Sequence, residues 1–169
     1  MKLVVIIVAA SVCVNLHYCE AEDKSRRQVS YNNCKPSAHI EASELQKVTY
    51  NANQMIKDWS VSAPNSYLAG GMSYADGKLT VPVTGLYYIY LHAYQNSYGR
   101  VLVNVNDAPV ALINAPSPPA IEQFASQVGG LFNLKENDEI SFTSHWNGCV
   151  LYMASKHTFF GAYLVELGI

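Results

Sequence analysis

Between Tyr67 and Pro82 the chain reads YLAGGMSYADGKLTVP, and from Gly85 to Tyr90 it continues GLYYIY. Short β-prone runs stand on both sides of the Asp-Gly pair at 76–77, and an Asp-Gly pair in that setting is a strong marker of a β-hairpin. This stretch therefore predicts two strands joined by a tight turn, followed directly by a third strand.

The third strand spans Leu86 to Tyr94 and is too rich in tyrosine and isoleucine for a helix. Successive side chains of a strand point to opposite faces. One face would carry Tyr87, Ile89 and Leu91, and the other would carry Tyr88 and Tyr90. Both faces are apolar, so we expect one of them to fill a core and the other to be covered as well.

The same period of two continues along the rest of the chain, where short strands alternate with turn residues. Residues 43–55 are expected to hold a loop and a short strand, and Pro109 marks a turn, an edge position or a bulge. Pro116–Pro119 must be a loop, because prolines lack the amide proton that a central strand needs. Further strands are expected at 35–42, 100–106, 129–134, 139–146, 149–154 and 158–167. About ten short strands with polar turns predict an all-β sandwich or jelly roll.

Length and composition indicate one domain with an unusually apolar surface. The chain has 169 residues, of which 14% are charged, against roughly 25% in ordinary soluble domains, and 12 are tyrosine. Such surfaces are typical of oligomers and of proteins that face a protein partner. A formal net charge of −2 and the lack of a basic run argue against nucleic acid or an anionic membrane surface as partner.

The N-terminus has the pattern of a cleaved signal peptide over residues 1–21. Lys2 precedes an apolar run from Leu3 to Leu16, and Ala21 offers a small residue at the cut. A membrane-spanning helix needs about 20 apolar residues, so we expect a secreted protein with no stable membrane span after cleavage. An uncleaved signal anchor at the cell surface is the alternative. Residues 22–34 would then form a flexible segment, and 35–169 the folded domain.

Cleavage would leave two cysteines, Cys34 and Cys149, in an oxidising compartment. They are the candidates for one disulfide. A bond between two chains through Cys34 is the alternative.

No catalytic motif is found, and we predict neither an enzyme nor a cofactor. His39, His92, His145 and His157 are scattered over different predicted strands or loops, which favours hydrogen-bonded or solvent-facing side chains over a metal site. The glycine pairs at 70–71 and 129–130 are interpreted as turn or bulge glycines rather than phosphate loops, because neither opens a helix.

Four blocks in order resemble the tumour necrosis factor (TNF) ligand family. They are KPSAHI at 35–40, the stretch from Tyr67 to Tyr90 quoted above, GGLFNLKENDEIS at 129–141 and FFGAYL at 159–164. The resemblance covers residues 35–167, with Asn137 in place of the usual glycine of the third block. It implies a TNF-like jelly-roll β-sandwich that acts as a homotrimer and binds cell-surface receptors of the tumour necrosis factor receptor family.

The resemblance also implies where partners would bind. Subunits would meet through Tyr88, Tyr90, Phe159 and Val165. The alternative for this face is cover by a loop or helix of the same chain. Receptor contacts would come from loops around 43–49, 96–100 and 116–119, with Glu44, Lys47, Tyr98, Arg100, Pro116, Ser117 and Pro118 as candidates. In the jelly-roll order, Cys34 and Cys149 would lie toward the same end of the molecule.

A second reading is a complement C-one-q-like globular head, a trimeric jelly roll that recognises diverse surface or pathogen ligands. That family shares a Val-Pro-x-x-Gly-Leu-Tyr-Tyr segment followed by His-Ala, here at 81–88 and 92–93. The Lys-Pro-x-Ala-His opening, the Phe-Gly-Ala near the end and the lack of a Gly-x-y repeat favour the cytokine reading.

Overall fold

The computed structural model describes residues 34–96, 99–114 and 123–168. Several predictions lie outside the described residues. They are the signal peptide, most of the segment 22–34, and the candidate receptor contacts Tyr98, Pro116, Ser117 and Pro118.

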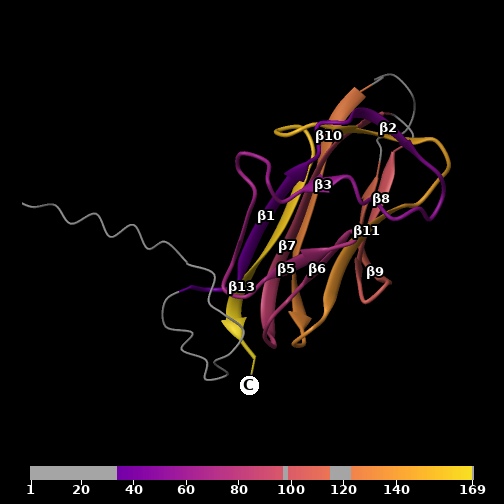
Figure 1. Ribbon diagram of the computed structural model, residues 1–169. Coiled ribbons are helices and arrows are strands. Elements are labelled where there is room, and N and C mark those ends of the chain that lie inside the picture. The colour runs from indigo at the N-terminus through magenta and orange to yellow at the C-terminus, as the bar shows by residue number, and fades with distance from the viewer. Residues whose placement is uncertain (1–33, 97–98, 115–122, 169) are drawn as a thin grey trace, which may run out of the picture.

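Within these ranges the regular elements are thirteen antiparallel β-strands (Figure 1). In chain order they are β1 (Ser37–Ala42), β2 (Gln46–Tyr50), β3 (Trp59–Ser60), β4 (Tyr67–Ala69), β5 (Ser73–Ala75), β6 (Lys78–Thr80), β7 (Gly85–Asn96), β8 (Arg100–Val105), β9 (Ala108–Asn114), β10 (Gln123–Leu134), β11 (Glu139–Ser144), β12 (Cys149–Met153) and β13 (Phe159–Leu167).

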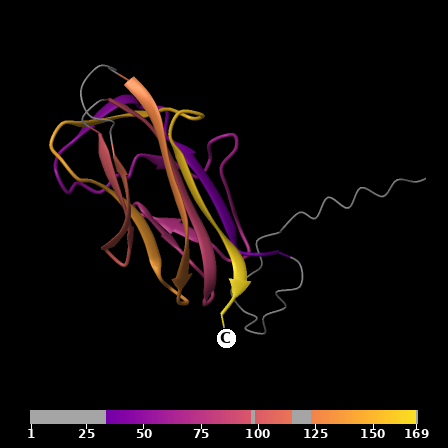
Figure 2. The ribbon, with the colours of Figure 1, turned by 180° about the vertical axis from the view of Figure 1, so that it is seen from behind.

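The strands form two sheets that pack face to face, as the front and back views show (Figures 1 and 2). The first sheet has the order β2-β12-β7-β13-β1-β3, with β10 also pairing β7 and β4 pairing β1. The second has the order β5-β6-β11-β8-β9. The predicted jelly-roll sandwich is confirmed.

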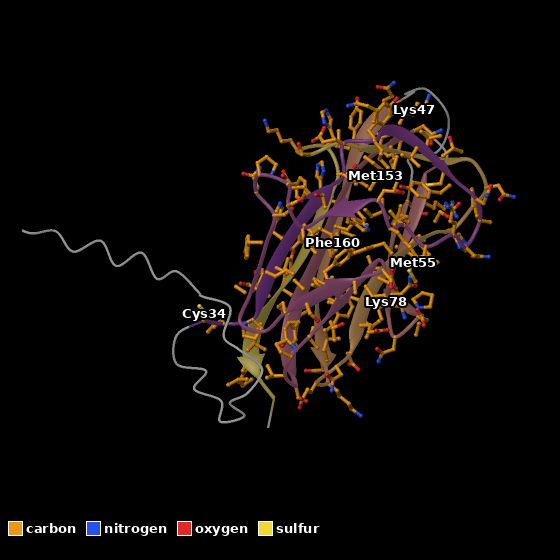
Figure 3. The ribbon with its side chains drawn as sticks, in the orientation of Figure 1. Cys34, Lys47, Met55, Lys78, Met153 and Phe160 are labelled. Atoms are coloured by element: carbon orange, nitrogen blue, oxygen red, sulfur yellow. The ribbon has the colours of Figure 1, made fainter. Side chains whose placement is uncertain are left out.

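An aromatic cluster lies at the centre of the core. Phe160 of β13 lies between the sheets (Figure 3). Its ring centroid is 4.6 Å from that of Phe142 of β11 and 4.7 Å from that of Trp59. The Trp59 indole donates to the Ile56 carbonyl at 2.9 Å, so its polar atom is satisfied inside the core. These rings join the two sheets.

Strand β7 has the alternation expected for it. Tyr87, Ile89 and Leu91 are buried at 0%, 1% and 2% exposure, while Tyr88 and Tyr90 point to the outer side and are only partly buried. The inner face thus fills the core, as predicted.

One strand is longer than expected, and another was not expected as a strand. β10 begins at Gln123 and not near Gly129, and it pairs with β7 residue for residue from Gln123↔Asn96 to Leu134↔Gly85. Pro109 lies in the edge strand β9, next to the register shift in its pairing with β8. An edge strand and a bulge are the two places where a sheet tolerates proline, so this expectation held.

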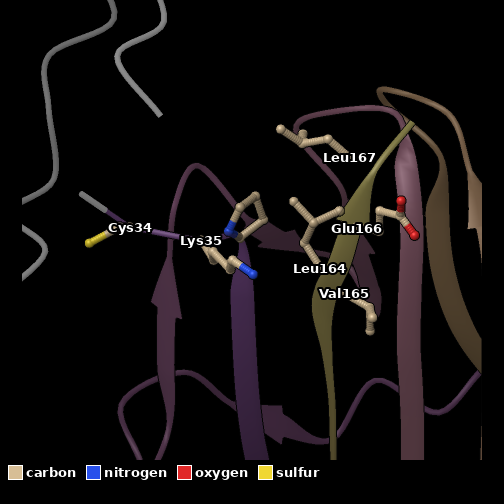
Figure 4. A pocket seen from close by; sticks show the side chains of 7 residues that line it. Cys34, Lys35, Leu164, Val165, Glu166 and Leu167 are labelled. Carbon is tan, nitrogen blue, oxygen red and sulfur yellow. The ribbon is translucent and has the colours of Figure 1, made fainter. Parts of the chain in front are cut away.

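The expected Cys34–Cys149 disulfide is wrong. Cys149 is a free thiol with 0% exposure, in β12 at the Gln95 end of β7. Cys34 lines a hollow with the C-terminal part of β13, whose Leu167 pairs with Gly85 at the opposite end of β7 (Figure 4). Ten strand residues at roughly 3.3 Å each separate the two ends. A disulfide requires Cα atoms within about 7 Å, so the two cysteines cannot pair, and their expected placement at one end is wrong as well.

Candidate functional site

The outer side of the first sheet carries a continuous apolar surface, which we call the aromatic face. It is formed by side chains of β1, β7, β10 and β13, namely His39, Tyr88, Tyr90, His92, Leu131, Phe159, Tyr163 and Val165. Leu131, Tyr163 and Val165 are 56%, 44% and 40% exposed.

The aromatic face exposes almost no charge. Among the residues of β7, β10 and β13, Glu166 near the C-terminal end of β13 is the one charged side chain. Glu41 of β1, opposite Phe159, is also on this side of the sheet, but it is 2% exposed and accepts hydrogen bonds from Asn65. Exposed strands of monomeric proteins usually carry charges that keep them soluble and separate. A face of this kind indicates that another surface covers it.

Ring contacts hold the aromatic face together. Phe159 lies between His39 and His92, with centroid distances of 5.1 Å and 4.8 Å, and the His92 ring is parallel to it within 5°. The Nδ1 atom of His39 and the hydroxyl of Tyr90 form a hydrogen bond of 2.8 Å. Tyr88 packs against Tyr163 at 5.4 Å. These contacts hold the side chains of the face in place within the single chain.

Two glycines make room for the tyrosine rings. A Cβ on Gly129 would lie 2.3 Å from the Tyr88 hydroxyl oxygen, and a Cβ on Gly161 would lie 2.2 Å from that of Tyr90. The hydroxyl ends of the two rings thus lie over the glycine backbone of the neighbouring strands. The interpretation of Gly129 as a turn or bulge residue is wrong, since it lies inside β10, whereas Gly70 and Gly71 have the positive φ angles of turn glycines.

Between β7 and β10 the aromatic face is hollowed. The hollow has a volume of about 350 Å³ and lies over Gly129, bordered by Tyr88, Tyr90, His92 and Phe159. Burial raises the pKa of Tyr90 to about 12, so its hydroxyl stays protonated and can donate at neutral pH. The site offers aromatic surface and hydroxyl groups.

All four residues expected at a subunit interface lie on this face. Tyr88 and Tyr90 come from β7, and Phe159 and Val165 from β13. Sequence reasoning missed His39, Leu131 and Tyr163, although the period of two in 129–134 and 158–167 carried the signal for the last two.

The described receptor-contact candidates fall in two places. Glu44 and Lys47 are exposed near β12 and the turn after it, where Glu44 accepts from the Ser155 amide at 2.8 Å and Lys47 is opposite Tyr152. Arg100 starts β8 and contacts Trp146 in the loop after β11.

The described residues contain no group of three or more His, Cys, Asp or Glu side chains that could hold a metal ion. In the same part of the chain, no helix is long and apolar enough to cross a membrane.

This fold is that of a jelly-roll β-sandwich domain. The family model described as "TNF(Tumour Necrosis Factor) family" matches residues 57–165, more than half of the chain. The chain therefore belongs to the TNF family.

A solved structure has the same fold. It is the structure of Eiger TNF from S. frugiperda, which aligns with a TM-score of 0.64 and 14% sequence identity over 80% of this chain and 96% of that chain. No curated protein matches the sequence.

Proposed function

We propose that this protein is a secreted, cytokine-like ligand that binds and clusters receptors of the tumour necrosis factor receptor family as a homotrimer. Membership of the family supports a ligand rather than an enzyme, because TNF family proteins are cytokine ligands. The same match favours the cytokine reading over the complement C-one-q-like head.

The observation that supports the homotrimer is the exposed apolar surface of the aromatic face, whose Leu131, Tyr163 and Val165 are 40% exposed or more. Burial of an aromatic side chain contributes on the order of 2 to 3 kcal/mol, and each subunit would bury several. Every copy of the chain carries the same face, so a second and a third copy can always cover it. The family supplies the three-fold arrangement, with Tyr88, Tyr90, Phe159 and Val165 near the shared axis.

Secretion is the second part of the proposal. Ligands of this family are extracellular or membrane-anchored. The apolar run from Leu3 to Leu16 and the candidate cut at Ala21 support secretion. N-terminal sequencing of protein recovered from culture medium should begin near Glu22, or after Arg27 if a proprotein convertase also cuts the basic stretch Lys24-Ser25-Arg26-Arg27. Full-length chain in the membrane fraction would instead support an anchor.

The assembly is tested by light scattering on the purified protein at micromolar concentration. We expect three times the mass of one chain. The same sample is then passed over a panel of receptor ectodomains of the family, immobilised one at a time. A clean monomer would overturn the homotrimer, and a trimer that binds no ectodomain of the panel would overturn the receptor assignment.

A further inference from the structure

A tryptophan and an arginine meet on the surface away from the aromatic face. Trp146 lies in the loop between β11 and β12 and is 46% exposed. The guanidinium carbon of Arg100 lies 3.7 Å from the centroid of its ring, a close cation–π contact. The ring of His145 stacks beside Trp146 at 6.1 Å.

Hydrogen bonds hold the backbone around this pair. The His145 amide donates to the Arg100 carbonyl at 2.9 Å, which ties the loop to the start of β8. The Ala52 amide donates to the Asn147 side chain at 2.8 Å, and the Asn53 amide donates to the Ser144 carbonyl at 2.7 Å. In Figure 1 these loops lie beside β8, β11 and β2. Because these loops are already held in place, a partner that binds here would lose little free energy to ordering them.

The charge of Arg100 is not neutralised within the described part of the chain. The two ion pairs found there both belong to Lys78. The adjoining loops, residues 51–54 and 144–148, contain no Asp or Glu. The guanidinium therefore combines a positive charge with planar donors, and this geometry suits a carboxylate.

We propose that the Arg100–Trp146 pair is a receptor contact that takes an acidic side chain on Arg100 and an apolar neighbour of it on the Trp146 ring. This inference rests on the proposed function, since the partner is the receptor ectodomain. Tryptophan and arginine are the residue types most enriched among the few side chains that dominate protein interfaces. The four strands of the aromatic face contain no Lys or Arg. The Arg100–Trp146 pair therefore offers an acidic partner side chain a positive charge that the aromatic face does not.

The test uses the ectodomain that binds best in the panel, measured against the trimeric protein by surface plasmon resonance. Trp146→Ala should weaken binding on the order of 30-fold, the loss expected for a dominant contact. Arg100→Gln should weaken binding at least about tenfold and make the association rate less sensitive to salt. Arg100→Lys keeps the charge and loses the planar stack, so it should restore the salt sensitivity and only part of the affinity.

Matched controls are Val110→Ala and Lys135→Ala, an exposed apolar and an exposed basic residue on other parts of the surface. Both should bind as the unchanged protein does. All variants are first shown to be trimers by light scattering. If the unchanged protein binds an ectodomain and both Trp146→Ala and Arg100→Gln bind it equally well, this inference is overturned and the proposed function stands. If no ectodomain binds the unchanged protein, the proposed function fails first.

Discussion

At the residue scale, the buried carboxylate of Glu41 connects three parts of the chain. It is 2% exposed and accepts from the backbone and side-chain amides of Asn65 at 3.2 Å and 3.0 Å, and from the Lys156 amide at 3.3 Å. Burial raises the pKa of this carboxyl, but hydrogen bonds from Asn65 and Lys156 outweigh burial and lower it overall. Glu41 therefore stays ionised and fixes two loops to β1.

Removing this carboxylate should destabilise the fold. Glu41→Ala leaves the amides of Asn65 and Lys156 without their acceptor, and we expect a loss on the order of 2 to 4 kcal/mol in the free energy of unfolding. Urea denaturation measures it, with the exposed Glu136→Ala as control. An unchanged midpoint for Glu41→Ala would show that the two loops need no acceptor.

His39 gives the fold a dependence on pH. Burial lowers its pKa, and the charge of Glu41 opposes that shift; its other ring neighbours are Tyr67, Tyr90 and Phe159. The unfolded chain thus takes up a proton at a higher pH than the folded chain. The stability from neutral His39 is complete above the unfolded pKa of about 6.5 and is lost as the pH falls toward the lower folded value.

We expect the free energy of unfolding to decrease between about pH 7.5 and pH 5.5, above the range in which carboxylates titrate. His39→Gln, which retains a hydrogen-bonding group for Tyr90, should show a smaller decrease. Denaturation curves at the two pH values compare them. Equal decreases in both proteins would assign the effect to other histidines.

At the element scale, β10 and β13 each place a glycine under a tyrosine of β7. The two glycines differ in what surrounds them. A Cβ on Gly161 would meet the backbone carbonyl oxygen of Ala38 at 2.3 Å as well as the Tyr90 hydroxyl, whereas the closest atoms to a Cβ on Gly129 belong to the Tyr88 ring. A side chain can swing away more easily than a paired strand can move.

Gly161→Ala should therefore cost more stability than Gly129→Ala. We expect about 2 to 4 kcal/mol for the first, because β1 must shift, and about 1 kcal/mol for the second. Thermal unfolding followed by circular dichroism compares them. Similar losses would mean that the β1–β13 pairing adapts as readily as a single ring.

At the scale of the whole molecule, the aromatic face decides whether the chain can exist alone. Tyr90 lies at the centre of this face, where its hydroxyl is hydrogen-bonded to His39 and lies over Gly161. A charge there is tolerated in a monomer, where water reaches the face. In a homotrimer, three such charges would be near one axis without water.

Tyr90→Glu should give a folded protein that is monomeric or aggregates and does not bind receptor. An unpaired charge in an interface costs on the order of 3 to 5 kcal/mol, and three would repel one another. Light scattering gives the mass and circular dichroism shows the fold, with Tyr90→Phe as the matched control that keeps the ring. A Tyr90→Glu protein with the mass of three chains would contradict the placement of Tyr90 at a subunit interface.

The sequence by itself determined where most strands lie and which of their side chains point to the same face of a sheet. Alternation in Leu86–Tyr94, the Asp-Gly turn at 76–77 and the ordered blocks over 35–167 depend on neighbours a few positions apart, and those are visible in one chain. The fold class and the inner face of β7 followed from them. Tyr88, Tyr90, Phe159 and Val165 could be placed on one face by alternation together with the family resemblance.

Only the tertiary structure decided which distant residues meet. It separated Cys34 from Cys149 by the length of β7, put Gly129 inside a strand under Tyr88, and brought Arg100 onto Trp146. These contacts depend on sheet order and on the register between strands that are far apart in the chain. A shift of one residue in register moves a side chain to the opposite face, so no local pattern could have predicted them.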